Sequence, residues 1–235
     1  MAPSWTPATR NVGAPHAGPD RRAVALELAV AVVIGFVLHR QCAMTPNKGA
    51  RPARLPPLRD RIGPVVRVLF VGINPGVRSS LTGHHFAGFS NRFWKLLYEA
   101  RLVPEPLTSA DDGRLPEWGY GITNLVPRPT PGIDTLRPEE YLAGRARLTA
   151  KIRRHRPEVV ALVGVTVYRA MCPAQKGPVA LGLRPEELGG SAVFVLPNPS
   201  GRNANYSYSE MLAAFRALRR HLARPAKRRD RPAPG

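Results

Sequence analysis

Four short apolar segments, each followed by a helical pattern, constrain the fold of this chain more than any other feature of its sequence. The first segment, 65–71, is rich in β-branched residues and nearly continuously apolar, as expected for a parallel strand buried on both faces. Similar patterns recur at 120–126, 158–163 and 192–196. Strands that alternate with helices predict a parallel sheet covered on both sides. We therefore expect an α/β fold with three layers around a central, mainly parallel four-stranded sheet.

The predicted helices lie between and after these strands, over 91–101, 138–155, 165–172 and 207–221. The second of them begins with Pro138, which suits a first helical turn, and two glutamates follow it at the positive end of the helix dipole. Ser207 and Glu210 have the spacing of a capping box, which predicts the start of the last helix.

Charge and cysteine content narrow the classes of function. The 235 residues carry a formal net charge of +19, of which the two ends of the chain, 1–60 and 219–235, contribute +11. Such a balance favours a polyanionic partner, either nucleic acid or an anionic membrane, although a GC-rich genome also enriches arginine. The two cysteines, Cys42 and Cys172, exclude a disulfide framework, an all-cysteine zinc site and a four-thiolate iron–sulfur cluster. They fit a reducing compartment.

The ends of the chain differ in composition from its middle. We expect a disordered N-terminal extension over 1–60 and a disordered basic tail over 222–235. Within the extension, the apolar segment 23–39 contains one glutamate and is marginal for a membrane span. It is either a membrane anchor or part of a non-native leader upstream of a translation start at Met44. We favour the start at Met44, and we do not expect membrane attachment.

Two of the predicted strands are followed by an Asn-Pro pair. Residues Gly72-Ile73-Asn74-Pro75-Gly76 follow the first strand, and residues Asn198-Pro199-Ser200-Gly201 follow the last. Ligands of open α/β sheets bind beyond the carboxyl ends of the strands. Glycine lets a backbone approach a ligand closely, and asparagine offers a donor and an acceptor without charge. Either motif alone is typical of an ordinary turn, but two at one edge of a basic sheet indicate a binding site.

These motifs belong to a larger set that resembles the mismatch-specific uracil/thymine DNA glycosylase family, which is family 2 of the uracil-DNA glycosylase superfamily. The matching blocks, in order, are Gly72 to Gly76, Thr82-Gly83 with Phe86-Ala87, Asn91 to Lys95, Gly121 to Val126 with Arg128-Pro129-Thr130, and Leu196 to Gly201. The resemblance implies a uracil-DNA glycosylase-like fold and a glycosylase domain over 61–221. It also implies a monofunctional enzyme of base-excision repair that flips out and excises uracil opposite guanine. Thymine and etheno or alkylated pyrimidines are further candidate bases.

The resemblance also implies roles for individual residues. Asn74 would hold and orient the attacking water, because an amide is not a strong base near neutral pH. Phe86 would stack on the flipped base, and backbone N–H groups near Ile73 and Phe86 would read its carbonyl edge. Gly76 stands where stricter uracil glycosylases carry a bulky aromatic residue, which predicts a roomy pocket. Asn124 would also contact the substrate, at a position where some relatives have lysine.

The second Asn-Pro motif resembles the loop that enters DNA in this family. We expect Asn198, Pro199, Ser200 and Gly201 to contact the backbone near the flipped nucleotide, and Arg202 to fill the vacated gap. For the histidines of the first loop, His84 and His85, we expect exposure to solvent.

The expected partner is double-stranded DNA with U·G or related mismatches. We expect no metal, no cofactor and a monomer, localised to the bacterial cytoplasm with the nucleoid. The alternative that the sequence leaves open is a non-catalytic α/β nucleic-acid-binding module.

Overall fold

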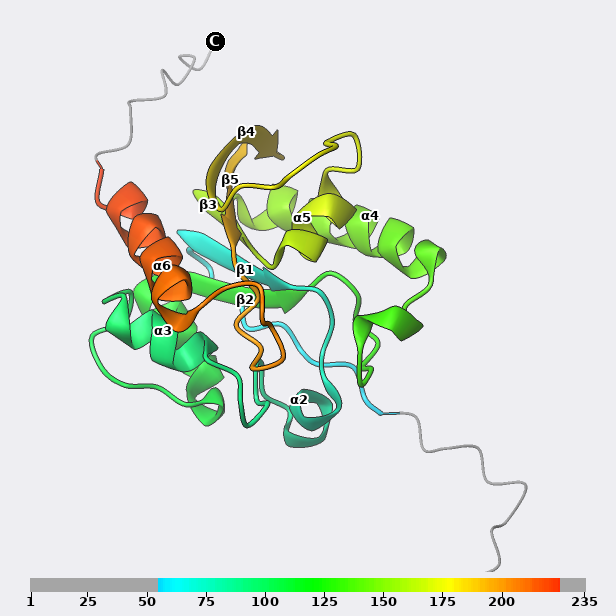
Figure 1. Cartoon of the computed structure of the whole chain (residues 1–235), viewed down its shortest axis with the longest axis horizontal. Coiled ribbons are helices and arrows are strands. Elements are labelled where there is room, and N and C mark those ends of the chain that lie inside the picture. The colour runs from blue at the N-terminus through cyan, green and yellow to red at the C-terminus, as the bar shows by residue number, and fades with distance from the viewer. Residues whose placement is uncertain (1–54, 225–235) are drawn as a thin grey trace, which may run out of the picture. The chain divides into compact units, whose positions relative to one another are not determined.

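In the part of the chain that the structure describes, the central sheet has five strands, one more than the sequence predicts. A computed structural model describes residues 55–224 (Figure 1). The strands are β1 (Val68–Gly72), β2 (Tyr120–Asn124), β3 (Val159–Val163), β4 (Gly182–Leu188) and β5 (Ser191–Leu196). They lie in the order β2-β1-β3-β5-β4, and all neighbouring pairs are parallel except β4 with β5. The predicted α/β class with a mainly parallel sheet is thus confirmed, and the expected count of four strands is wrong.

The sequence does not predict the additional strand, β4, because β4 lacks the apolar run that marks the other four strands. It contains Pro185 and charged residues, and its residues alternate between exposed and half-buried. Proline cannot donate a hydrogen bond to a sheet and is tolerated only at edges and irregularities. Here β4 is the edge strand, and its pairing with β5 is interrupted between Leu183 and Glu187, around the proline.

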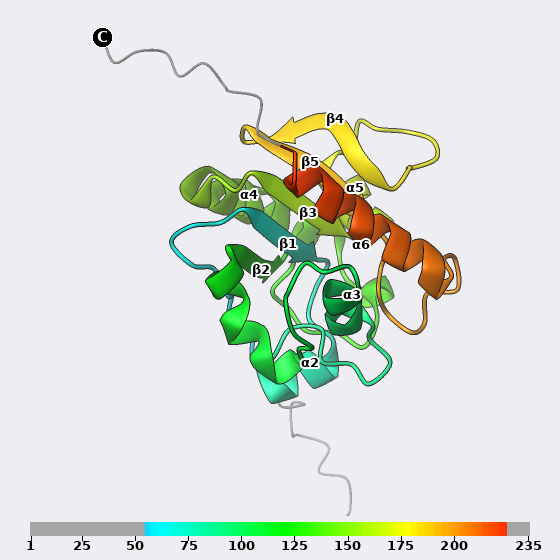
Figure 2. The same ribbon diagram turned by 90° about the vertical axis from the view of Figure 1, so that its left-hand side faces the viewer.

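The helices cover both faces of the sheet. They are α2 (Val77–Thr82), α3 (Phe93–Glu99), α4 (Pro138–His155), α5 (Val165–Met171) and α6 (Tyr208–Leu222), with the 3₁₀ helices η1 (Ser109–Trp118) and η2 (Ile133–Thr135). In Figure 1, α3 and α6 lie on one side of the sheet and α4 and α5 on the other. Figure 2 looks onto the side of α3 and α6.

This layering follows from the alternation of side chains along the strands. In β1, Val68 and Phe70 pack in the core beneath α3 and α6, whereas Leu69 and Val71 pack in the core beneath α4 and α5. All four side chains are fully buried. Each buried aliphatic or aromatic side chain stabilises the fold by about 1.5–3 kcal/mol, so a polar residue in this strand would disrupt one layer or the other.

The helix boundaries agree closely with the sequence signals. Pro138 and the two glutamates open α4, and the capping box of Ser207 and Glu210 opens α6, as predicted. The helix predicted over 91–101 is shorter, because Arg101 takes a left-handed conformation with φ 58° directly after the C-cap Ala100.

The predicted terminal segments lie largely beyond the described part of the chain. The apolar segment 23–39, Met44 and all but three residues of the predicted tail 222–235 lie outside residues 55–224. Within 55–224, no helix combines the length and the apolar character that a membrane crossing requires.

Candidate active site

The loops that carry the sequence motifs meet at one edge of the sheet. β1, β3 and β5 run parallel, so the segments that leave them, 73–76, 164–165 and 197–207, gather at their carboxyl ends. The segment 125–132 leaves β2 at the same edge. The strand order reverses between β1 and β3, which is the switch point where doubly wound α/β sheets bind ligands.

Asn74 is half-buried at the exit of β1, and of the two polar atoms of its side-chain amide only Nδ2 forms hydrogen bonds with described residues. Its Nδ2 donates to the Pro75 carbonyl at 3.2 Å, to the Arg128 carbonyl at 3.1 Å and to Thr130 Oγ1 at 2.7 Å. The Thr130 hydroxyl in turn donates to the Gly132 carbonyl at 2.5 Å, so its oxygen is the acceptor toward Asn74.

These partners determine which way the amide points. Carbonyl oxygens only accept hydrogen bonds, so the NH₂ group must face them. The Oδ1 atom of Asn74 therefore points away from Arg128 and Thr130, and it accepts no hydrogen bond within residues 55–224. The result is a fixed, unengaged and uncharged acceptor at the sheet edge.

Phe86, Gly72 and Asn124 form a second cluster beside Asn74. Phe86 is half-buried and stacks on Phe93 with ring centroids 4.2 Å apart and planes at 24°. A methyl group at Gly72 would come within 2.7 Å of Asn124 Oδ1 and 3.5 Å of the Phe86 ring. Only glycine lets both side chains reach over the end of β1 in this way.

His85 orients the amide of Asn124. Contrary to the expectation of a solvated histidine, it is buried, and its Nε2 lies 2.9 Å from the Arg59 carbonyl. The carbonyl can only accept, so the proton is on Nε2. Burial lowers the pKa of His85 by disfavouring the charged ring, so Nδ1 carries a lone pair. Asn124 Nδ2 donates to that Nδ1 over a long 3.4 Å, which leaves Oδ1 directed over Gly72.

Two backbone donors remain unused beside this cluster. Within the described residues, the N–H groups of Ile73 and Phe86 donate to no acceptor. Phe86 also has φ 51°, a conformation that non-glycine residues rarely adopt. The N-cap of α2, Gly76, is exposed, and a Cβ there would have no neighbour within 4 Å among the described residues.

The loop after β5 is held by its own side chains. Asn198 Oδ1 accepts from the Ser200 N–H at 3.0 Å, and Asn203 Nδ2 donates to the Asn198 carbonyl at 2.7 Å. Pro199 is buried, and its carbonyl accepts from the Arg92 N–H at 2.9 Å. Asn198, Gly201 and Arg202 are exposed.

Gly201 lies close to the loop between α2 and α3, and a Cβ at Gly201 would collide with Ser90 of that loop. Arg202 follows, and its Nη1 donates to the Pro131 carbonyl at 3.1 Å. The loop after β5 is therefore anchored to the segment 90–92 on one side and reaches the segment after β2 on the other.

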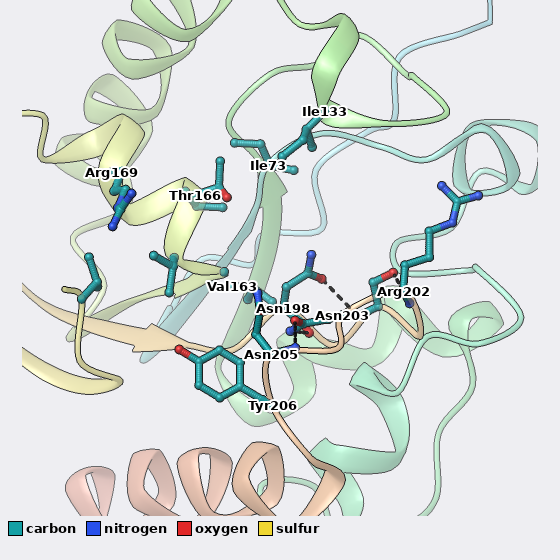
Figure 3. Close-up of a pocket in the computed structure, with 15 residues that line it drawn as sticks. Ile73, Ile133, Val163, Thr166, Arg169, Asn198, Arg202, Asn203, Asn205 and Tyr206 are labelled. Carbon is teal, nitrogen blue, oxygen red and sulfur yellow. Dashed lines mark hydrogen bonds between the residues drawn. The ribbon is translucent and has the colours of Figure 1, made fainter. Parts of the chain in front are cut away.

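A cavity of about 460 Å³ lies on the α5 side of this loop (Figure 3). Its lining includes Ile73, Asn198 and Arg202 together with Thr166 and Arg169 of α5. Asn74, Gly76, Phe86 and Asn124 are not part of the lining. The predicted residues thus fall into two neighbouring groups: one near the ends of β1 and β2, and one around the cavity near the ends of β3 and β5.

The cavity has a positive lining. Its described residues include two arginines and no acidic residue. Neither Arg169 nor Arg202 forms an ion pair with another residue of the described segment; each donates to a backbone carbonyl instead. In the same segment, no three His, Cys, Asp or Glu side chains are grouped as metal ligands would be.

Sequence reasoning missed the residues that position the predicted ones. Thr130 is buried and holds Asn74, and it lies in the block Arg128-Pro129-Thr130 that the resemblance had already singled out. Asp112 is buried and binds the loop of His84 and His85, but its sequence neighbourhood, next to Asp111 in a polar stretch, carries no signal of such a role.

Fold and site together define a doubly wound α/β protein with an uncharged polar site and a basic cavity at its switch point. The family model of the uracil DNA glycosylase superfamily matches residues 60–223. The chain belongs to this superfamily. Its members are DNA glycosylases, which act on uracil in DNA and hydrolyse the N-glycosidic bond that joins base to sugar.

Proposed function

We propose that the protein is a mismatch-specific uracil-DNA glycosylase of family 2, with residues 61–221 as its catalytic domain. It excises uracil paired with guanine as a monofunctional enzyme at the start of base-excision repair, and it works as a monomer on chromosomal DNA in a bacterial cytoplasm. The observation that carries this proposal is Asn74, whose Nδ2 has three acceptors while its Oδ1 has no donor among the residues that the structure describes.

Hydrolysis of the N-glycosidic bond requires a group that positions the attacking water, and a fixed hydrogen-bond acceptor can do so. The bond between C1′ of the sugar and N1 of the base breaks, its electron pair leaves with the base, and a water oxygen bonds to C1′. An amide does not take the proton of that water near neutral pH. Asn74 Oδ1 instead accepts a hydrogen bond from the water and orients its lone pair toward C1′, while the proton passes to solvent. Catalysis by Asn74 is then positioning rather than base catalysis.

The neighbouring cluster suits the flipped base. Phe86 offers an aromatic face for stacking, and the free N–H groups of Ile73 and Phe86 can donate to a base carbonyl, which stabilises the negative charge of the leaving base. Asn124 presents its Oδ1, an acceptor that fits the N3–H of uracil and thymine and not the bare N3 of cytosine.

Preference for mismatches follows from the cost of base flipping. Extruding a nucleotide costs roughly 2–4 kcal/mol, and it costs least where pairing is already poor. Arg202, together with Asn198, Ser200 and Gly201, belongs to the loop that we assign to the DNA backbone and to the gap left by the flipped nucleotide. The open surroundings of Gly76 leave space for a 5-methyl group, so thymine, which keeps its N3–H, is a further substrate. Etheno and alkylated pyrimidines are further candidates for this space, but an etheno bridge at N3 removes the hydrogen that Asn124 would accept.

A panel of oligonucleotides tests this proposal. The full chain is incubated with U·G, T·G and U·A duplexes and with single-stranded uracil, and abasic sites are cleaved with alkali. We expect U·G to be processed fastest. Equal rates on U·G, U·A and single strands would show that the enzyme lacks mismatch specificity. Binding of all duplexes without any base release would support the non-catalytic module instead.

A further inference from the structure

The loop between α2 and α3 carries two phenylalanines in opposite situations. Phe86 is half-buried and stacks on Phe93. Phe89 is 89% exposed, the highest value among the exposed large hydrophobic residues of the described chain. An aromatic ring held in water contributes nothing to the core, so the fold itself gives no reason for Phe89.

The backbone that presents Phe89 is well fixed. The Asn91 N–H donates to the Gly88 carbonyl at 2.9 Å, which closes a turn with Phe89 at its corner. Both backbone groups of Ala87 are bound by side chains of α2: its N–H donates to Ser79 Oγ at 3.1 Å, and its carbonyl accepts from Arg78 Nε at 2.8 Å. Phe89 therefore sits at the tip of a braced turn.

Arg78 also fixes the ring. Its guanidinium carbon lies 3.6 Å from the centroid of the Phe89 ring, so the cation covers one aromatic face. The rest of this highly exposed side chain faces solvent. A flat ring backed by a cation on one face and open on the other is a platform on which a nucleobase can stack.

The turn adjoins the loop that we assign to DNA. The Arg92 N–H donates to the Pro199 carbonyl. A side chain at position 201 would collide with Ser90, so the two loops are in direct contact at Gly201. Both loops are free of negative charge: no acidic residue occurs over 61–98 or 191–209. Phe89 and Arg202 thus project from two touching, basic loops, and a polyanion is the partner that fits them.

We propose that Phe89, braced by Arg78, is a second DNA-contacting wedge, which stacks on a base of the duplex that loses its neighbour when the target nucleotide flips out. This inference rests on the proposed function, because only a duplex with a flipped nucleotide offers such an unstacked base. Phenylalanine is among the wedge residues that minor-groove-binding proteins insert between partly unstacked bases.

Binding to a non-cleavable duplex tests the wedge. The full chain and its variants are titrated by fluorescence anisotropy with a duplex that carries 2′-fluoro-deoxyuridine opposite guanine. Phe89→Ala and Phe89→Leu should raise Kd by about five- to 150-fold, the range for loss of one base–aromatic stack. Phe89→Trp should bind like the parent. Leu142, on α4, is also an exposed apolar residue, and Leu142→Ala is the matched control, which should leave Kd unchanged.

Two results would overturn the wedge: unchanged affinity of Phe89→Ala, or a Phe89→Leu variant that binds as tightly as the parent, since leucine is apolar but cannot stack. The assay measures binding and not base release. If the parent protein releases no base in the oligonucleotide panel, the proposed function is refuted, and the Kd values of the variants can still be compared. If the parent is active and the Phe89 variants bind as tightly as the parent, the wedge alone is refuted.

Discussion

Asn74 owes its orientation to residues far from it in the sequence. Two of the three acceptors around its Nδ2 come from Arg128 and Thr130, on the segment that follows β2. The motif at 72–76 therefore predicts an asparagine at the sheet edge but not the direction of its amide. That direction depends on a tertiary contact, and it decides whether the free atom is a donor or an acceptor.

Removal of the Thr130 hydroxyl should loosen the Asn74 amide. Thr130→Val keeps the shape of the side chain but leaves Nδ2 with two acceptors. One net hydrogen bond is worth about 0.5–1.5 kcal/mol, so we expect the single-turnover rate on a U·G duplex to fall about three- to tenfold. Thr149→Val, on α4, is the control and should keep the parental rate. A Thr130→Val enzyme as fast as this control would show that Asn74 needs no such support.

Bulk at position 76 should narrow the range of bases. Gly76 has an ordinary φ of −71°, and no neighbour restricts a side chain there. We expect Gly76→Tyr to fold, to retain uracil excision, and to lower thymine excision from T·G by roughly tenfold or more, since a pocket that excludes one methyl group discriminates on this scale. Gly113→Tyr, at another open glycine, is the control. Equal T·G to U·G ratios in both variants would mean that position 76 does not face the base.

Among the elements, η1 has an unexpected role as the support of the loop 83–92. Its Asp112 is 1% exposed and accepts from the His85 N–H at 2.9 Å and from Arg61 Nε at 3.1 Å, and it contacts the His84 ring at 3.1 Å. The carboxylate thus holds the loop in which Phe86 takes its left-handed conformation.

Loss of this buried charge should destabilise the loop and the domain. In Asp112→Asn, either the His85 N–H or Arg61 must face an NH₂ group. We expect the free energy of unfolding in urea to fall by about 1–3 kcal/mol, the cost of an unsatisfied buried group. We also expect faster hydrogen exchange of the His85 amide. Asp134→Asn, at an exposed aspartate, is the control. Parental exchange at His85 in Asp112→Asn would rule out the anchoring role.

The start of α4 and the segment that holds Asn74 are joined by an ion pair. Arg128 donates to both carboxylate oxygens of Glu140, at 2.6 and 2.8 Å, and this contact lowers the pKa of Glu140 to about 2. A carboxyl group with a depressed folded-state pKa stabilises the protein above its ordinary value of 4.5, and this contribution disappears as the pH falls toward 2.

The pH dependence of unfolding checks this ion pair. Glu140→Gln should be less stable than the parent at pH 7, and the difference should shrink between about pH 4.5 and pH 2. Glu139→Gln removes a charge from the same helical turn without that partner and should show little such convergence. A gap between Glu140→Gln and the parent that stays constant down to pH 2 would mean that the pair contributes nothing to stability.

For the whole domain, the sequence predicts what depends on periodicity and fails where tertiary contacts decide. The four parallel strands and the bounds of α4 follow from apolar runs, proline and charge, all of which act locally. The edge strand β4 carries a proline and was missed. The burial of His85 was also missed, because the carbonyl of Arg59 and the carboxylate of Asp112 that bind it come from distant segments.

The candidate site shows the same division. The two Asn-Pro motifs were expected at one sheet edge, and they do lie there, because parallel strands end together. Their separation into a group near β1 and β2 and a cavity near β3 and β5 depends on the strand order, which no local pattern encodes.

In the proposed reaction, the uncharged amide of Asn74 at the end of β1 positions the attacking water. The most direct test of this role is the single-turnover rate of Asn74→Ala on a U·G duplex, measured together with the Kd for the non-cleavable 2′-fluoro duplex. We predict a rate about 10²–10³-fold lower, as for loss of one catalytic hydrogen bond, with Kd within about threefold of the parent. An unchanged rate, or a loss that appears entirely in Kd, would contradict this account.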